Sequence, residues 1–370
     1  MPPEGIVFST IGTLRNTMLT PLRRCRGSWS GARWSSLMWI MRLQTDMQNY
    51  LQKLRIWSGT LARWKMIRDD FAVLILTHGR ADKVYTIKRV LEAGNYTGKW
   101  YLVIDDEDDQ AGEYIERYGK EKVQIFCKQA VDDRIDTMDT FHEHRAIVYA
   151  RNAAFDVARK LGLKYFLEFD DDYVDCMFRV DNGEKFIGVH CGDLDRLFES
   201  MLDFLDDTGA LTVAFCQGGD FIGGKNNARV REQVLRKAMN SFFCRTDMPV
   251  DFFGTINEDV NMYTLLGSRG ALIMSIVAVM IVQKQTQKTA GGMTELYLDG
   301  GTFKKSFYTV MAMPSAVTVR VMGDKHMRMH HSVNWECCVP KIINQAYRKE
   351  RSESNGREKK SRGGEPHPDE

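Results

Sequence analysis

Three consecutive aspartates, Asp170, Asp171 and Asp172, are the residues whose type and spacing point most directly to chemistry. They follow the apolar run LKYFLEF, which is typical of a buried strand. Side chains alternate along an extended chain, so Asp170 and Asp172 can face one site while Asp171 faces away. Like charges this close repel unless a cation neutralises them, and Mg²⁺ or Mn²⁺ prefers oxygen ligands. We therefore predict a divalent metal site here; a solvated acidic loop is the alternative interpretation.

A second run of acidic residues, 105–109, ends the earlier strand-like segment WYLVIDDEDD. If this strand lies beside the first, its end faces the same crevice, and Asp105 or Asp106 can accept a hydrogen bond from a base or ribose. A run of acidic residues is also commonly just a solvated loop.

The helical stretch before the aspartates, residues 141–161, carries two arginines and an asparagine that could contact phosphate. Arg145 and Asn152 are seven residues apart and fall near one helix face, while Arg151 lies to one side. Arginine is suited to phosphate oxygens, although an exposed helix arginine explains the spacing equally well.

These residues must be positioned by an alternation of strands and helices. Strands are predicted at FAVLILT, WYLVID, VQIFCK and LKYFLEF, with helices at 83–92 and 141–161 between them. This pattern predicts a doubly wound α/β sheet, in which ligands bind beyond the carboxyl ends of the strands. Further along the chain we predict a basic amphipathic helix at 228–240 and strands at 211–216, 241–246, 250–259, 271–282 and 316–322.

The charge is distributed unevenly along the 370 residues, although the formal total is only +2. Residues 1–68 hold eleven Lys or Arg against two acidic residues, whereas residues 69–346 hold 33 basic and 41 acidic residues, a net charge of −8. We interpret residues 1–68 as a poorly ordered basic extension, 69–346 as the functional domain and 347–370 as a disordered charged tail. Alternatively, the extension binds nucleic acid or an anionic membrane.

No segment suggests a membrane protein or a disulfide-stapled one. The longest apolar run, 271–282, is twelve residues long, short of the ~18 to 20 that a membrane span needs. We expect no signal peptide. The eight cysteines form no CxxC pair, so we expect reduced cysteines and a cytoplasmic protein.

Several motifs occur in an order that resembles known glycosyltransferases. THGRAD, RAIVYARNAAFDVARKLG and YFLEFDDDY resemble the nucleotide-sugar half of a GT-A glycosyltransferase with its Asp-x-Asp metal motif. NEDVNMYTLLGSRG, QTQKTAGGMTELY, GTFKKSFYTVMAMPSAV and MRMHHSVNW resemble the TET-associated glycosyltransferase family. The resemblance implies a GT-A-like, doubly wound mixed sheet with a Rossmann-like nucleotide-sugar half and an acceptor half.

The resemblance also implies roles for individual residues. Asp170 and Asp172 would bind Mn²⁺ or Mg²⁺, with a third ligand from His330 or His331 on a loop. Asp259 would act as the base of an inverting transfer, with Glu258 as alternate, whereas a retaining transfer needs no such base. The residues implied on the donor side are Thr77, Arg80, Asp105, Asp106, Arg145, Arg151, Asn152 and Asp171.

The function implied is transfer of a sugar from a nucleotide-diphosphate sugar, with a UDP-sugar expected, to DNA. Members of the family are encoded largely by bacteriophages and are associated with hydroxymethylated pyrimidines such as 5-hydroxymethylcytosine, so we expect a host cytoplasmic enzyme. Candidate DNA contacts are Lys304 and Lys305, and four residues of one predicted helix, Arg229, Arg231, Arg236 and Lys237. For the helix group, a solvated helix face is the alternative interpretation. The alternatives are a polysaccharide or protein acceptor, and a binding module of the same fold without turnover.

Overall fold

The structure is a computed structural model that describes residues 68–138, 146–181, 185–222, 224, 227, 234–284, 304–322 and 327–338. The predictions made for the basic extension, for Arg145, Arg229 and Arg231, and for the charged tail lie outside these residues.

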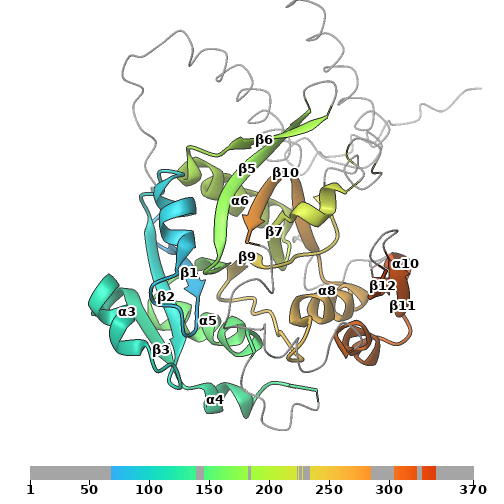
Figure 1. Cartoon of the computed structure of the whole chain (residues 1–370), viewed down its shortest axis with the longest axis horizontal. Helices are drawn as coiled ribbons and strands as arrows, with labels where there is room; N and C mark the ends of the chain where they lie inside the picture. Colours follow the sequence, from blue (N-terminus) through green and yellow to red (C-terminus); the bar gives the residue numbers. More distant parts are fainter. Residues whose placement is uncertain are drawn as a thin grey trace, which may run out of the picture.

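Four parallel strands form the first half of the central sheet (Figure 1). Their order is β3-β2-β1-β4, and every neighbouring pair is parallel. The strands correspond to the four predicted from the sequence: β1 (Phe71–Leu76), β2 (Lys99–Asp105), β3 (Val123–Phe126) and β4 (Tyr165–Asp170).

The second half of the sheet mixes strand directions and continues in the order β9-β7-β10-β5-β6, with β8 paired to β10. Only β7 and β10 are parallel neighbours here, while the remaining pairs are antiparallel. The α/β fold with a doubly wound mixed sheet is therefore confirmed. The strands are β5 (Tyr173–Asp181), β6 (Phe186–His190), β7 (Thr212–Cys216), β8 (Val234–Leu235), β9 (Ser241–Arg245) and β10 (Ile273–Gln283).

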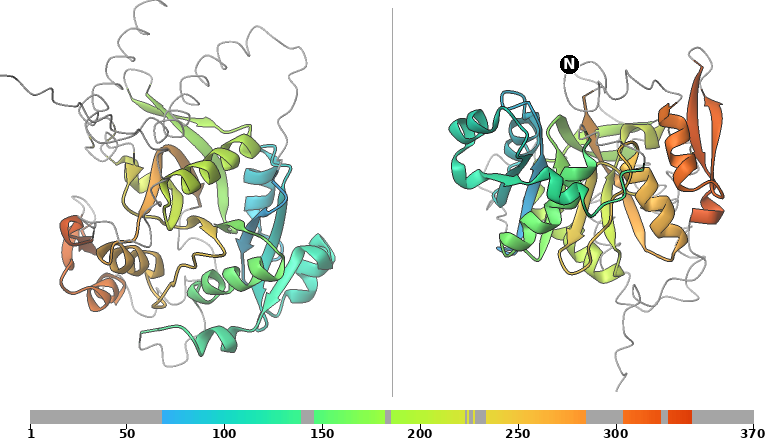
Figure 2. Two further views of the ribbon diagram at one scale, coloured as in Figure 1. Left: turned by 180° about the vertical axis from the view of Figure 1, so that it is seen from behind. Right: turned by 90° about the horizontal axis from the view of Figure 1, so that it is seen from below.

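Helices cover both faces of the sheet, which explains why β1 is a continuous apolar run. Its alternate residues belong to two separate buried clusters. One cluster includes residues of α6 (Leu194–Thr208) and of η1 (Ile87–Glu92), a helix with π-type hydrogen bonding. The other includes α5 (Val148–Lys160) and α8 (Glu258–Ser268). Figure 2 shows these layers from two further directions.

The remaining elements lie at the two ends of the molecule. A two-stranded antiparallel ribbon and helical residues 304–312 stand at the opposite end from β3 (Figures 1 and 2). No helix among the described residues is long and apolar enough to cross a bilayer. The elements are α3 (Ala111–Tyr118), η2 (Lys120–Lys122), α4 (Lys128–Asp132), η3 (Gly218–Phe221), β11 (Val317–Met322), β12 (Arg328–Val333) and α10 (Trp335–Cys338).

The predicted basic helix at 228–240 is wrong for the part that the structure describes. Val234 and Leu235 form β8, because the β10 strand offers them backbone partners at Ser275 and Ile276. Lys237, a candidate DNA contact, forms an ion pair with the buried Asp220 instead.

The predicted strand at 250–259 is also wrong. Gly254 and Asn257 adopt positive φ angles of 75° and 55°, which interrupt an extended chain. α8 then begins at Glu258, so the acidic pair lies in the first turn of a helix.

Candidate active site

Asp170 is the last residue of β4, and Asp171 and Asp172 form the tight turn between β4 and β5. Thr86, fully buried just before η1, fixes this turn. Its hydroxyl donates to the Asp170 carbonyl oxygen at 2.6 Å and accepts from the Tyr173 N–H at 3.1 Å. Its own N–H donates to the Asp171 carbonyl oxygen at 3.1 Å. The aspartates are thus held by a residue that nothing in the sequence singled out.

The Asp171 carboxylate turns toward the loop that follows β1. It accepts hydrogen bonds from the Thr77 hydroxyl at 2.7 Å and from the Arg80 guanidinium at 3.1 Å. The Thr77 hydroxyl is also 2.9 Å from the phenol oxygen of the buried Tyr114. The structure therefore brings together three of the residues predicted on the donor side, Thr77, Arg80 and Asp171.

Arg151 joins Asp170 to the acidic pair of α8. Its side chain is 1% exposed. Its Nε donates to Glu258 Oε1 at 2.9 Å, and its Nη2 donates to Asp170 Oδ1 at 3.2 Å. Its Cζ also lies 4.9 Å from the centre of the Phe242 ring. The guanidinium is thus enclosed by protein groups and bridges carboxylates from two halves of the chain.

A third carboxylate, Glu168, completes the surroundings of Arg151. Its Oε2 lies 3.5 Å from Arg151 Nη1. Glu168 is fully buried and neither of its oxygens has a hydrogen-bond partner. Burial raises the pKa of Glu168 to about 8, so this carboxyl group is protonated near neutral pH.

Asn152, the neighbour of Arg151 in the sequence, holds the backbone rather than an open site. Its side-chain amide donates to the carbonyl oxygens of Val148 at 2.8 Å and Phe252 at 2.9 Å. Its side-chain oxygen accepts from the Phe252 N–H at 3.2 Å. Asn152 therefore ties α5 to the segment that leads into α8.

Burial and repulsion from neighbouring carboxylates raise the pKa values of Asp170 and Asp172 to about 6 each. Burial is the largest cause for Asp170, and repulsion from Asp172 adds to it while Arg151 works in the opposite direction. For Asp172, burial and the charge of Asp171 raise the pKa, whereas a 3.0 Å hydrogen bond from Gln283 lowers it. Added negative charge is therefore costly at this turn, and a bound cation would relieve that cost.

Glu258 and Asp259 are both buried in the first turn of α8. Whereas Glu258 pairs with Arg151, Asp259 accepts a hydrogen bond at 2.7 Å from the Val260 N–H. Burial raises the pKa of Asp259 to about 7, and the neighbouring Glu258 charge contributes. A carboxylate with a pKa near neutrality is suited to general-base chemistry.

Asp105, predicted to contact a base or ribose, is already engaged by other side chains. His78 Nδ1 lies 2.8 Å from its Oδ2, and the amine of the buried Lys128 lies 2.9 Å from its Oδ1. The hydrogen bond to Asp105 raises the pKa of His78, whose side chain is 50% exposed. Asp106 accepts from the Lys128 N–H at 2.9 Å. His78 therefore presents the exposed surface of this cluster, and neither His78 nor Lys128 was predicted.

His330 and His331 lie on the strand β12, not on the predicted loop. They pair with Arg320 and Val319 of β11, and their rings are 4.3 Å apart. Burial, followed by the nearby cations, lowers the pKa of His331 to about 3. In the part of the chain that the structure describes, no three His, Cys, Asp or Glu side chains form a group able to hold a metal. The third metal ligand expected from His330 or His331 therefore stays a prediction.

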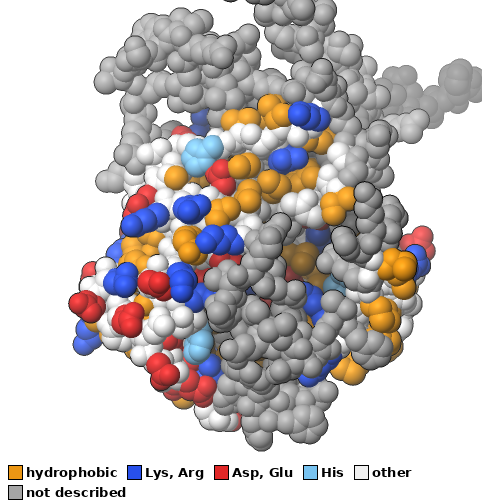
Figure 3. Space-filling model, viewed as in Figure 1, with side chains coloured by type: hydrophobic (Ala, Val, Ile, Leu, Met, Phe, Trp, Pro, Cys, Tyr) orange, Lys and Arg blue, Asp and Glu red, His pale blue; other side chains and the backbone are white. Residues whose placement is uncertain are grey.

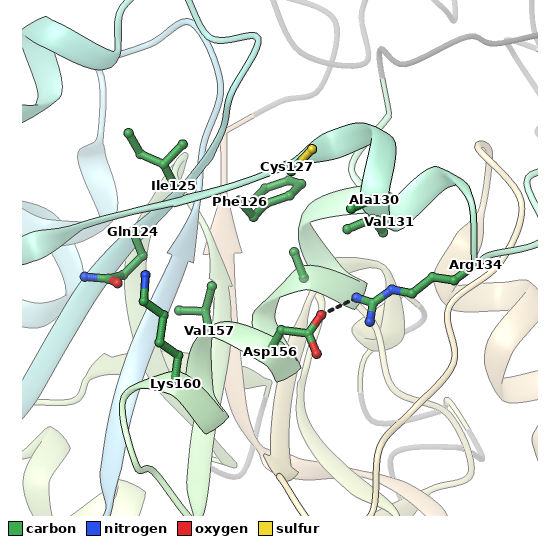
Figure 4. A pocket seen from close by; sticks show the side chains of 11 residues that line it. Gln124, Ile125, Phe126, Cys127, Ala130, Val131, Arg134, Asp156, Val157 and Lys160 are labelled. Atoms are coloured by element: carbon green, nitrogen blue, oxygen red, sulfur yellow. Dashed lines mark hydrogen bonds and ion pairs between the residues drawn. The ribbon is translucent and has the colours of Figure 1, made fainter.

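A separate cavity of about 260 Å³ lies between β3, α4 and α5. Figure 4 shows its side chains, with an ion pair between Arg134 and Asp156 on one side. None of its lining residues belongs to the carboxylate cluster. We therefore place the candidate site at the β4–β5 turn and not in this cavity.

Comparison with known proteins identifies the family. The family model of the TET-associated glycosyltransferases matches residues 71–292, which span β1 to the end of β10. The chain belongs to the TET-associated glycosyltransferase family. The match includes both the aspartates and the acidic pair, and the protein is a glycosyltransferase. No curated protein matches the sequence.

Solved structures similar to this TET-associated glycosyltransferase are distant. The mannosyltransferase PcManGT from Pyrobaculum calidifontis, in complex with GDP-Man and Mn²⁺, is 12% identical with a TM-score of 0.40, covering 76% of this chain and 74% of its own. Glucosyl-3-phosphoglycerate synthase from Mycobacterium tuberculosis is 10% identical with a TM-score of 0.37, covering 71% and 86%. Mannosyl-3-phosphoglycerate synthase from Rubrobacter xylanophilus is 12% identical, also with a TM-score of 0.37.

The residues of the TET-associated glycosyltransferase fit a divalent cation at Asp170 and Asp172. Mg²⁺ and Mn²⁺ commonly use one or two protein carboxylates and take their remaining ligands from water and substrate phosphates. The two aspartates supply hard oxygen donors, and their pKa values are raised first by burial and then by neighbouring carboxylates, both of which a cation would offset. Arg80 pairs with the neighbouring Asp171, and Arg151 pairs with one oxygen of Asp170.

Proposed function

We propose that the protein transfers a sugar from a nucleotide-diphosphate sugar, with a UDP-sugar expected, to the hydroxymethyl group of a modified pyrimidine in DNA. The observation that carries this proposal is the cluster in which Arg151 bridges Asp170 and Glu258, within a chain of the TET-associated glycosyltransferase family. We place the reaction in the cytoplasm of a phage host, and we assign it to residues 69–346.

The donor would lie along the carboxyl ends of β1, β2 and β4, where open α/β sheets bind ligands. Asp170 and Asp172 would hold Mn²⁺ or Mg²⁺, which supplies charge stabilisation to the departing diphosphate. Arg80, which is 17% exposed and paired with Asp171, is placed to meet a phosphate oxygen. His78, held by Asp105, would face the ribose or the base.

The acceptor would approach from the side of α8. In an inverting transfer the acceptor oxygen attacks the anomeric carbon, and the bond between that carbon and the diphosphate oxygen breaks. The proton of the acceptor hydroxyl passes to a carboxylate. Asp259 has the pKa that suits this base, whereas Glu258 is neutralised by Arg151. Arg151, whose side chain is 1% exposed, would keep Glu258 and Asp170 in place.

The test is incubation of the purified protein with Mn²⁺, labelled UDP-sugars and duplex DNA that contains 5-hydroxymethylcytosine or 5-hydroxymethyluracil. We expect label to enter modified DNA and not unmodified DNA, with an Asp172→Asn variant inactive. Transfer to a polysaccharide or protein, with no transfer to either DNA, would overturn the proposal that DNA is the acceptor. Tight nucleotide binding without any transfer would instead indicate a binding module.

A further inference from the structure

Four residues, Tyr85, Lys88, Arg89 and Lys284, form a basic and aromatic surface beside the aspartate turn, which we call the Tyr85 surface. The amine of Lys284 lies 3.4 Å from the centre of the Tyr85 ring, and Arg89 Cζ lies 5.5 Å from it. One tyrosine therefore holds two cations from segments far apart in the sequence. Lys88 and Arg89 are exposed, and Lys284 is partly exposed.

The Tyr85 surface is joined directly to the proposed metal site. The Lys284 N–H donates to the Asp172 carbonyl oxygen at 3.2 Å, and the preceding residue, Gln283, donates its side-chain amide to the Asp172 carboxylate at 3.0 Å. Tyr85 also directly precedes Thr86, which fixes the aspartate turn. The cations therefore stand at the rim of the carboxylate cluster.

The charge of this surface is not explained by ion pairing. Within the described residues, no carboxylate forms an ion pair with Lys88, Arg89 or Lys284, although residues 69–346 carry a net charge of −8. Figure 3 shows Lys and Arg side chains close together on the part of this face that lies over η1. Like charges collected beside one another in an acidic protein indicate an anionic ligand.

We propose that the Tyr85 surface binds the phosphate backbone of the acceptor nucleic acid and so brings the modified base to the Asp170–Asp172 end of the sheet. This inference rests on the proposed function. Exposed cations on two separate segments suit a ligand with repeated phosphates, and such contacts fix register and orientation without reading sequence. Contact with the Tyr85 ring limits the freedom of both cationic side chains, which reduces the entropy lost on binding.

The test compares the wild type with the double variant Arg89→Gln/Lys284→Gln. Lys122→Gln is the matched control, because Lys122 Nζ lies 4.6 Å from the ring centre of Trp100, far from the aspartates in the fold. Binding of a duplex that contains 5-hydroxymethylcytosine is measured by fluorescence anisotropy across a salt series, without sugar donor. Affinity for UDP in the presence of Mn²⁺ is measured by calorimetry.

The slope of log affinity against log salt is negative. We expect it to become shallower by about 1.8 in the double variant, since each lost phosphate contact removes about 0.9 from its magnitude. The control slope and all UDP affinities should match the wild type. An unchanged slope, or weakened UDP binding with unchanged DNA binding, would overturn the inference. If the wild type transfers sugar to DNA while the slope is unchanged, only this inference fails. If the wild type binds no DNA even at low salt, both proposals fail.

Discussion

Asp259 is the residue on which the proposed chemistry depends most directly, and its pKa makes the assignment testable. Burial raises this pKa to about 7, so the carboxyl group is protonated below that pH and cannot accept the acceptor proton. We expect kcat/KM to rise with pH up to about 7 and then level off.

Asp259→Asn should lower kcat by about 10² to 10⁴ and remove the part of the pH dependence centred near 7, since it removes the base. The measurement is a pH profile of single-turnover transfer, with Glu258→Gln as the companion variant. If Glu258→Gln removes the pH dependence and Asp259→Asn retains it, then Glu258 is the base.

Removal of the Arg151 guanidinium would leave three carboxyl groups, those of Glu168, Asp170 and Glu258, without their cationic partner. Arg151→Gln should lower the free energy of unfolding by about 3–5 kcal/mol, as expected when one partner of a buried ion pair is lost. Arg159→Gln, on the same helix but 46% exposed and paired with Asp156, should cost less than ~1 kcal/mol. Urea unfolding measures both. Equal small losses would show that the Arg151 contacts contribute little.

At the scale of elements, the hydroxyl of Thr86 couples η1 to the β4–β5 turn. Thr86→Val keeps the side-chain shape but loses the bonds to Asp170 and Tyr173, so the carboxylates should be less well placed. We expect a lower kcat and a higher Mn²⁺ concentration for half-maximal activity, with about 1–3 kcal/mol lost in stability. Thr208→Val, whose hydroxyl bonds within α6, is the control. Unaltered Mn²⁺ dependence would contradict this role.

Much of this element order could be predicted from the sequence, because buried strands such as Phe71–Leu76 are continuous apolar runs. The aspartate cluster could be predicted for the same reason, since it directly follows one of them. Its partners Thr77, Arg80 and Arg151 were among the residues predicted for the donor side. Thr86 and Gln283 were not, because they reach the turn from elements distant in the sequence, and a hydrogen bond between such residues leaves no local pattern. The segment 250–259 was wrongly predicted as a strand because its apolar residues are buried although its backbone is not extended.

At the scale of the whole molecule, the source of DNA affinity can be separated from the basic extension. Removal of residues 1–67 takes away ten basic and two acidic residues but leaves Arg68, which pairs with Asp70 and lies 4.4 Å from the Tyr165 ring centre. If the Tyr85 surface supplies the contacts, kcat/KM on modified DNA at 150 mM salt should change by less than about threefold, an effect below 1 kcal/mol. A tenfold or larger loss, measured with the truncated chain at equal concentration, would assign the affinity to the extension.

The strand order of the sheet differs from the order in which the strands are synthesised. Asp171 and Asp172 alone connect β4 to β5, yet β9, β7 and β10 lie between these two strands in the sheet. All three are encoded later in the chain than the turn itself. A nascent chain that has just emerged past Asp172 therefore lacks the three strands that separate β4 from β5 in the finished sheet. The β4–β5 turn reaches its final surroundings, which include the hydrogen bond from Gln283 to Asp172, only after β10 has been inserted.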